Sequence, residues 1–124
     1  TLLMPAVTAK HLEHVRDQIG GWMLATGSSL GADAQEVLRR DFHIATYGQL
    51  CHFALKIAEL AEQEGHHPSI LLDWGRIRVE SWTHKTWRVS KNDLILAAKI
   101  NRMLQRLPED FVRAHRHTAV KGSR

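Results

Sequence analysis

Three stretches of the chain place apolar residues at the three- and four-residue spacing of an amphipathic helix. This spacing predicts helices over about 8–19, 46–64 and 90–104. Thr46 stands at capping-box spacing at the start of the second helix, and Gly65 suits the left-handed conformation that ends it. The apolar positions behind these predictions are Leu12, Val15, Ile19, Leu50, Ala54, Ile57, Ala58, Ala61, Leu94, Ala97, Ala98, Ile100 and Leu104.

Between these helices, apolar and polar residues alternate, which is typical of strands with one buried face. The predicted strands cover 22–25, 37–44, 70–74 and 77–81. A Gly/Ser-rich turn over 27–31 joins the first two strands, and a tight turn at Gly75 joins the last two. Strands joined by short turns pair antiparallel, and helices must cover their apolar face. The chain therefore predicts an α+β fold: a two-layer, four-stranded antiparallel sheet with helices on one face (α-β-β-α-β-β-α).

A length of 124 residues with 44% hydrophobic content is typical of one globular domain. We assign 1–108 to this domain and 109–124 to a basic C-terminal tail. Four of the 17 Lys and Arg residues lie in the last dozen positions, where no acid occurs, so the remaining thirteen are matched by thirteen acids. A nucleic-acid reader carries its charge on a folded face. We therefore predict no direct nucleic-acid contact and prefer a solvated tail over the alternative of a tail that binds nucleic acid.

No apolar run approaches the roughly 20 residues that a bilayer span needs, so no membrane contact is predicted. The single cysteine, Cys51, rules out an internal disulfide framework and a thiolate-rich zinc site. It fits a reducing compartment, and we expect the protein to be cytoplasmic. Because the chain begins at Thr1 rather than methionine, an organelle reached by a cleaved targeting segment stays open.

Nine histidines invite a search for metal or acid–base chemistry. His11 and His14 lie three apart on the first predicted helix, but the sequence places no third ligand beside them. A solvated helix face is therefore preferred there, and no metal is predicted. Four further histidines have no motif around them and are expected to be structural or surface residues: His43, His52, His115 and His117.

The His66-His67-Pro68 segment lies just after a predicted helix end and just before a strand. Two imidazoles there could simply hydrogen-bond the last helix carbonyls. Alternatively they form an acid–base pair, because imidazole titrates near pH ~6.5. The following hairpin returns His84 to the same end of the sheet, and Glu62 lies one helical turn before His66. The hairpin therefore favours the acid–base interpretation.

This arrangement resembles the motif of the pterin-4a-carbinolamine dehydratase (4a-hydroxytetrahydrobiopterin dehydratase) family. The motif is an acidic residue, three spacers, His-His-Pro, five or six spacers, an aromatic, nine spacers, His, a short variable gap and Asp. Here the spacings are three, five, nine and eight, and the resemblance runs over about 38–104 and more loosely from 22. The matching residues are Glu62, His66, His67, Pro68, Trp74, His84 and Asp93.

The resemblance implies a hydro-lyase that removes water from 4a-hydroxytetrahydrobiopterin to give quinonoid dihydrobiopterin, in tetrahydrobiopterin recycling. It implies acid–base catalysis by histidine, with no cofactor and no metal. His66 and His67 match the family's principal acid–base and binding histidines, and His84 matches its third. We expect His66 to engage the 4a-hydroxyl most closely, whereas the division of acid and base among the three stays open.

Other matching positions are expected to bind substrate. Trp82 and Thr83 correspond to a strand segment whose backbone holds the pterin ring in the family, and Pro68 belongs to the motif, although it also forces the exit from the helix. Trp74 matches the aromatic position, and packing over the hairpin explains it equally well.

Two acidic positions also have alternative interpretations. Glu62 orients a histidine or binds the pterin, or it faces solvent. Asp93 fits the motif, but it also stands at N3 spacing from Ser90, and we favour the capping role. Where many family members have Gly-Leu, this chain has Arg88-Val89, preceded by an extra aromatic residue, so the loop at the rim of the site is expected to follow a different route.

The resemblance also implies partners. Family members form dimers and tetramers through sheet edges and helix faces, so a homodimer or homotetramer is expected. Some serve as dimerisation cofactors for a homeodomain transcription factor, and distant relatives act as assembly factors. A non-catalytic role of that coactivator type is therefore the alternative to the enzyme.

Overall fold

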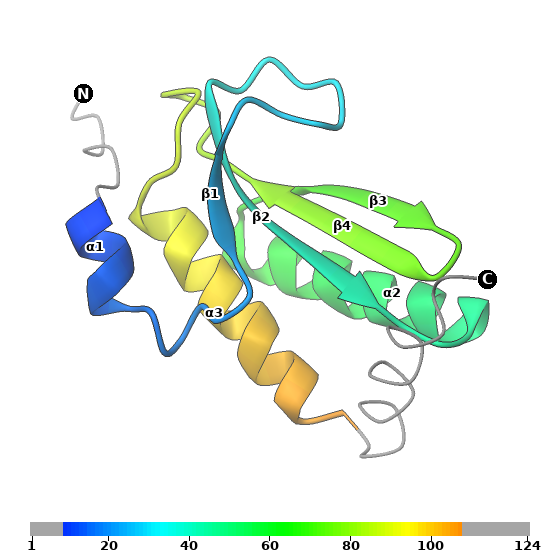
Figure 1. The fold of residues 1–124 in the computed structure, drawn as a ribbon. Helices are drawn as coiled ribbons and strands as arrows, with labels where there is room; N and C mark the ends of the chain where they lie inside the picture. Colours follow the sequence, from blue (N-terminus) through cyan, green and yellow to red (C-terminus); the bar gives the residue numbers. More distant parts are fainter. Residues whose placement is uncertain (1–8, 108–124) are drawn as a thin grey trace.

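The computed structural model describes residues 9–107 and shows one sheet with helices packed against it (Figure 1). The elements are α1 (Ala9–His14), β1 (Met23–Thr26), β2 (Glu36–His43), α2 (Tyr47–Glu64), β3 (Ser69–Asp73), β4 (Arg76–Ser81) and α3 (Lys91–Gln105). All pairs are antiparallel, in the order β1-β2-β4-β3. The predicted α+β fold is confirmed.

The register of the sheet determines which loops meet. In the β3–β4 pair, Ser69 lies opposite Glu80 and Asp73 lies opposite Arg76. The chain therefore enters β3 and leaves β4 at the same end of the sheet. The segments 66–68 and 82–84 are brought to that end together, as the sequence predicts.

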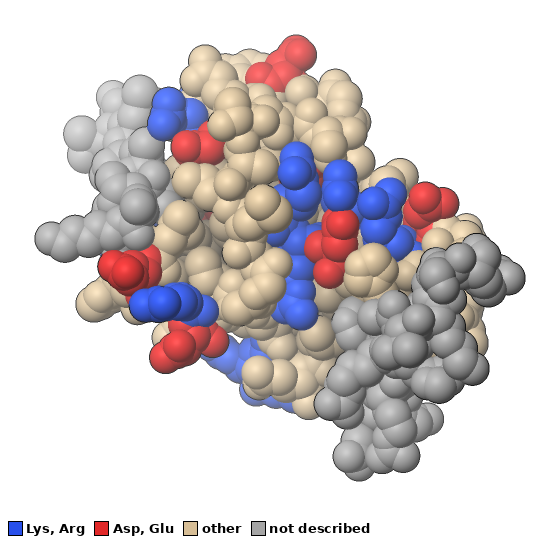
Figure 2. Space-filling view, viewed as in Figure 1, with Lys and Arg blue, Asp and Glu red and all other residues tan. Residues whose placement is uncertain are grey.

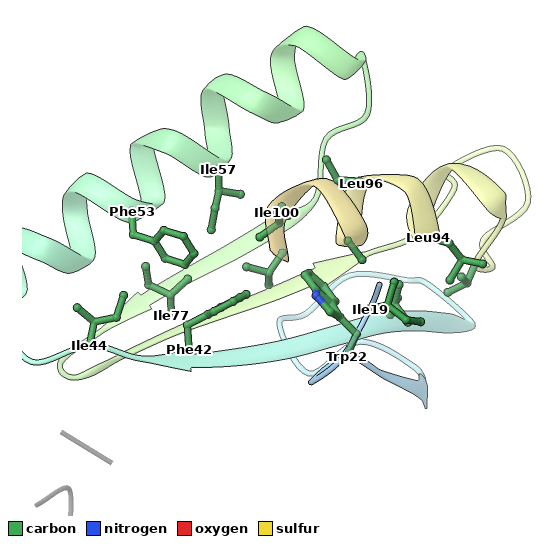
Figure 3. Packing of buried hydrophobic residues seen from close by; sticks show 14 of the residues in the cluster. Ile19, Trp22, Phe42, Ile44, Phe53, Ile57, Ile77, Leu94, Leu96 and Ile100 are labelled. Carbon is green, nitrogen blue, oxygen red and sulfur yellow. The ribbon is translucent and has the colours of Figure 1, made fainter. Parts of the chain in front are cut away.

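The core lies between the sheet and the helices α2 and α3 (Figure 3). Phe42 of β2 is at its centre: its ring makes edge contacts with Phe53 of α2, at 5.0 Å between centroids, and with Trp22, at 6.1 Å. Ile77 and Val79 of β4 are fully buried on the same face. Period-two alternation in the central strands therefore gives a largely apolar face, interrupted by Arg40 and Ser81, which the helices cover.

Helix α2 begins and ends at the predicted residues. The Thr46 hydroxyl accepts a hydrogen bond from the backbone N–H of Gln49 at 3.1 Å. Gly65 has φ 66° and ψ 28°, so its left-handed conformation turns the chain directly into His66. The buried stripe differs from the predicted one, because Ala58 is exposed and Phe53 is buried in its place. Phe53 fits between Leu50 and Ile57 at helical spacing, and the larger side chain fills the core.

The first helix is shorter than predicted. It ends at His14, and the following residues form tighter turns, in which Val15 N–H donates to Leu12 and Gln18 N–H donates to Val15, each three residues back. Ile19 is nevertheless buried in the core, so the apolar positions were identified correctly although the helix does not reach them. The glycine pair that follows removes helix propensity, which favours short turns here. Strand β1 likewise begins one residue later than predicted.

Some predictions fall outside the described part of the chain. The basic tail 109–124, with His115 and His117, is not described, and neither is the side chain of His11. His14 is exposed at the end of α1. Within residues 9–107, none of the helices combines the length and apolar character that a bilayer crossing requires.

The other face of the sheet carries interleaved charges over β2 and β4 (Figure 2). Arg78 donates to both oxygens of Asp41, at 2.7 and 2.9 Å. Glu80 is fully buried and accepts hydrogen bonds from Ser28 and Ser29 of the β1–β2 loop and from Arg39 at 2.8 Å. This network ties the β1–β2 loop to the sheet.

Removing the Glu80 charge is expected to destabilise the protein in a pH-dependent way. Burial by itself raises the pKa of Glu80, but the hydrogen bonds from Ser28, Ser29 and Arg39 outweigh it and hold the pKa below its usual value. The stabilisation is thus present above about pH 4.5, where the unfolded carboxyl ionises, and is lost as the pH falls through the lower native pKa. Glu80→Gln should lower the free energy of unfolding by about 1–3 kcal/mol at pH 7.

Urea unfolding at pH 7 and near pH 3 measures the free energy of unfolding of the wild type and of Glu80→Gln. The exposed Glu59→Gln change on α2 is the control for charge removal. The difference in the free energy of unfolding between the wild type and Glu80→Gln should be smaller at the lower pH. A difference that stays constant over this range would contradict the assignment.

Candidate active site

The site forms where the C-terminus of α2, the end of β4 and the N-terminus of α3 meet. His66 follows the left-handed Gly65, and its backbone N–H donates to Ala61 at 3.1 Å. Its Nε2 lies 2.5 Å from Oδ1 of Asp93 in the first turn of α3. His66 is therefore anchored at its backbone N–H and at its ring nitrogen Nε2. Of its side chain, 15% stays exposed.

Asp93 is fully buried and accepts from four donors. Oδ1 accepts from the Ser81 hydroxyl at 2.5 Å in addition to His66. Oδ2 accepts from the Thr83 hydroxyl at 2.9 Å and from the Ser90 N–H at 2.8 Å. A carboxylate has about four acceptor positions, so Asp93 is saturated. It therefore caps α3, as favoured from the sequence, and also contacts His66.

Ser81 is a site residue that the sequence analysis missed. Its hydroxyl and that of Thr83 both reach Asp93, which lies against the helix-covered side of the sheet. Alternation along β4 carried the signal, because Ser81 follows the buried Ile77 and Val79 at period two. A serine in that series places a polar group where the others place apolar ones, and such a group needs a partner.

His67 makes a different contact from its neighbour. Its Nε2 lies 3.0 Å from Oε1 of Glu62, and both side chains are largely exposed. Glu62 thus contacts a histidine and also faces solvent, with 81% of its side chain exposed, and its role in the site stays a prediction. An exposed pair of this kind contributes little to the stability of the fold. Because the His67 side chain is largely exposed, its ring is accessible at the surface.

His84 lies on Trp82, with 5.0 Å between the ring centroids. Trp82 is buried and packs with Ala34 and Val37 in a second, smaller apolar cluster. Thr83, between them in the chain, reaches Asp93 instead. The structure thus brings His66, Thr83 and Asp93 together, whereas the convergence of His84 with the other two imidazoles stays a prediction.

Within one copy of the chain, Trp74 lies far from His66, Thr83 and Asp93. It occupies the turn between β3 and β4, with 61% of its surface exposed, whereas Pro68 lies just before β3 and is half-buried. Five strand residues at about 3.3 Å each separate these two ends by roughly 16 Å. A single chain therefore does not bring Trp74 to His66, and its role in binding stays a prediction.

The loop after β4 has no glycine, and its expected departure from the family's route stays a prediction. Trp87, rather than Arg88, takes the left-handed conformation, with φ 62°. The carbonyl of Trp87 accepts from the Gln35 and Glu36 amides at 2.7 and 3.3 Å, and Thr83 pairs with Arg88 across the loop. A non-glycine residue in this conformation costs on the order of 1 kcal/mol, which these backbone bonds offset.

Within residues 9–107, His, Cys, Asp and Glu side chains do not gather in groups of three or more that could hold an ion. What this corner offers is an imidazole hydrogen-bonded to a buried carboxylate, an arrangement that histidine-based acid–base sites use.

Comparison with known proteins relates this corner to a family. The family model described as pterin 4 alpha carbinolamine dehydratase matches residues 5–103. A protein of Syntrophotalea carbinolica, provisionally named a pterin-4-alpha-carbinolamine dehydratase, is 36% identical over 82% of this chain and 86% of its own. A protein of Photobacterium profundum with the same provisional name is 39% identical over the same shares.

A solved structure shares the fold. The crystal structure titled transcriptional coactivator/pterin dehydratase from Brucella melitensis superposes with a TM-score of 0.63 at 23% identity, covering 79% of this chain and 97% of that one. The family match covers the residues that build the His66–Asp93 corner, and the two relatives align with 82% of this chain. The chain therefore belongs to the pterin 4 alpha carbinolamine dehydratase family.

Proposed function

We propose that this protein dehydrates a 4a-hydroxytetrahydropterin, such as 4a-hydroxytetrahydrobiopterin, with His66 as the principal acid–base group. The observation that carries the proposal is the hydrogen bond between His66 and the buried carboxylate of Asp93. A carboxylate in this position orients the imidazole and stabilises its protonated form, as in other histidine-based acid–base sites. The family membership supports the choice of substrate.

The reaction requires two proton movements and no change of oxidation state. The C4a–O bond breaks, and the departing hydroxyl gains a proton to leave as water. N5 loses a proton, and the C4a–N5 bond becomes double, giving the quinonoid dihydropterin. An imidazole suits both movements, because it donates and accepts protons near neutral pH.

The neighbouring residues fit roles around this centre. We propose His67, held by Glu62, and His84, lying on Trp82, as the second and third imidazoles at the same end of the sheet. We propose that the pterin ring lies along the backbone of 82–83 and beside Pro68. Trp74 would join such a site only from a second copy of the chain.

An assay with freshly generated 4a-hydroxytetrahydropterin tests the proposal directly. Water loss is followed by absorbance, with and without protein, at neutral pH. We expect a rate proportional to protein concentration and well above the spontaneous one. A rate that does not change with added protein would remove the enzymatic assignment.

A second candidate function is that of a protein partner. The Brucella melitensis protein has coactivator in its title, and α2 of this chain exposes the apolar side chains of Tyr47 and Leu55. A partner that binds this helix would not need the histidines. Retention of a captured partner by both the wild type and His66→Ala would support this role, and retention by neither would remove it.

We also propose that the protein forms a homodimer or homotetramer. β1 and β3 are the edges of the sheet, and β3 presents Ile70, Leu71 and Leu72 with no proline or lysine among them. Such an edge is suited to pairing with another strand. Light scattering should give a multiple of the 14.1 kDa chain mass, and a monomeric mass would contradict the proposal.

A further inference from the structure

The donors around Asp93 determine which nitrogen of His66 carries the proton. The Thr83 hydroxyl has one hydrogen, which it donates to Oδ2 of Asp93. The short contact between the Thr83 and Ser90 hydroxyls must then have Ser90 as donor. The hydrogen bonds therefore run in one direction, from Ser90 to Thr83 to Asp93, while Ser81 donates from the other side.

His66 meets this carboxylate as its fourth partner. A saturated carboxylate only accepts, so Nε2 of His66 donates to it across the 2.5 Å contact. In the neutral imidazole, the lone pair is then on Nδ1. Ser81 and Thr83 matter here because each of them holds the Asp93 oxygens in the position that accepts from Nε2.

We propose that Ser81 and Thr83 are positioning residues, which act through Asp93 to hold His66 as its Nε2–H tautomer and so make Nδ1 the atom that transfers protons. The catalytic meaning of this inference rests on the proposed dehydratase function, but the tautomer itself does not. Neither hydroxyl needs to touch the substrate for this role, although the Thr83 backbone lies in the segment proposed to hold the ring.

The proton balance closes on Nδ1. Protonated His66 gives its Nδ1 proton to the departing hydroxyl, the C4a–O bond breaks and water leaves. The imidazole that remains is the Nε2–H form that Asp93 already holds, so no ring rotation is needed. The proton lost from N5 passes through solvent or another base and restores Nδ1–H, so one proton enters and one leaves in each cycle.

The test compares variants that remove or keep one hydroxyl. Thr83→Val removes the donor at nearly constant shape, Thr83→Ser keeps it, and Ser81→Ala removes the other hydroxyl if Thr83→Val fails to fold. Thr26→Val, at the exposed end of β1, is the matched control. The readouts are the His66 tautomer, from nitrogen NMR of histidine-labelled protein, and kcat and KM with 4a-hydroxytetrahydropterin.

We expect wild type, Thr83→Ser and Thr26→Val to show the Nε2–H tautomer. Thr83→Val should show a mixture of tautomers and a kcat lower by about 10–100-fold, by analogy with the outer partners of metal-bound histidines, with a smaller change in KM. A wild type that is mainly Nδ1–H, or a Thr83→Val variant with the wild-type tautomer, would overturn the inference. If the wild type shows no dehydratase activity, the proposed function fails, and the tautomer measurement still decides this inference.

Discussion

Replacing His66 with alanine is expected to slow dehydration by about 10²–10⁴-fold, the contribution of a general acid or base. The loss follows from geometry, because His66 combines a bond to a buried carboxylate with a partly exposed ring. Asp93 keeps its three other donors in the variant, so the free energy of unfolding should fall by only about 1–3 kcal/mol. Initial rates by absorbance, beside a urea titration, separate the two effects.

The matched control for this variant is His52→Ala, an exposed histidine on the same α2 helix. It should leave the rate unchanged. A His66→Ala rate within about threefold of wild type would contradict the catalytic role, since that is far below the effect of an acid–base group. His67→Ala and His84→Ala complete the series: losses of similar size would support one shared site, and an unchanged rate for His84→Ala would remove His84 from it.

The fold could be predicted from the sequence because its local signals agree with one another. Alternation in β2 and β4, the Thr46 cap and the left-handed Gly65 each depend on residues a few positions apart. Such signals need no knowledge of the tertiary structure. The end of α1 was the exception, since the apolar spacing continued to Ile19 although the hydrogen bonds tighten after His14. A side chain can be buried in the core from a turn as well as from a helix.

The site was only partly predictable, for a physical reason. The partners of Asp93 come from β4, the following loop and the end of α2, so the network exists only after the sheet and both helices have packed. The motif named Asp93, but local spacing explained it as a cap, and only the structure shows that one carboxylate does both. The position of Trp74, in contrast, could have been inferred, because a tight turn at Gly75 places it at the far end of the hairpin from His66.

The packing that supports the site leads to a second prediction of large effect. Leu50 and Leu55 lie on the same helix, but Leu50 is fully buried in the core and 56% of Leu55 is exposed. Leu50→Ala leaves a cavity between α2 and the sheet and is expected to lower the free energy of unfolding by about 2–5 kcal/mol. Leu55→Ala makes the same chemical change at the surface and should stay within about 0.5 kcal/mol of wild type.

Urea unfolding of both variants, followed by tryptophan fluorescence, measures this difference. Because α2 ends at Gly65, a loosened Leu50→Ala core should also weaken the placement of His66, so the dehydration rate should fall with stability as the temperature rises. Leu55→Ala should follow the wild-type rate over the same range. Equal losses of stability in the two variants would show that Leu55 is as buried in solution as Leu50. The exposed α2 face would then be an interface between copies of the chain, and α2 would be held in place from both sides.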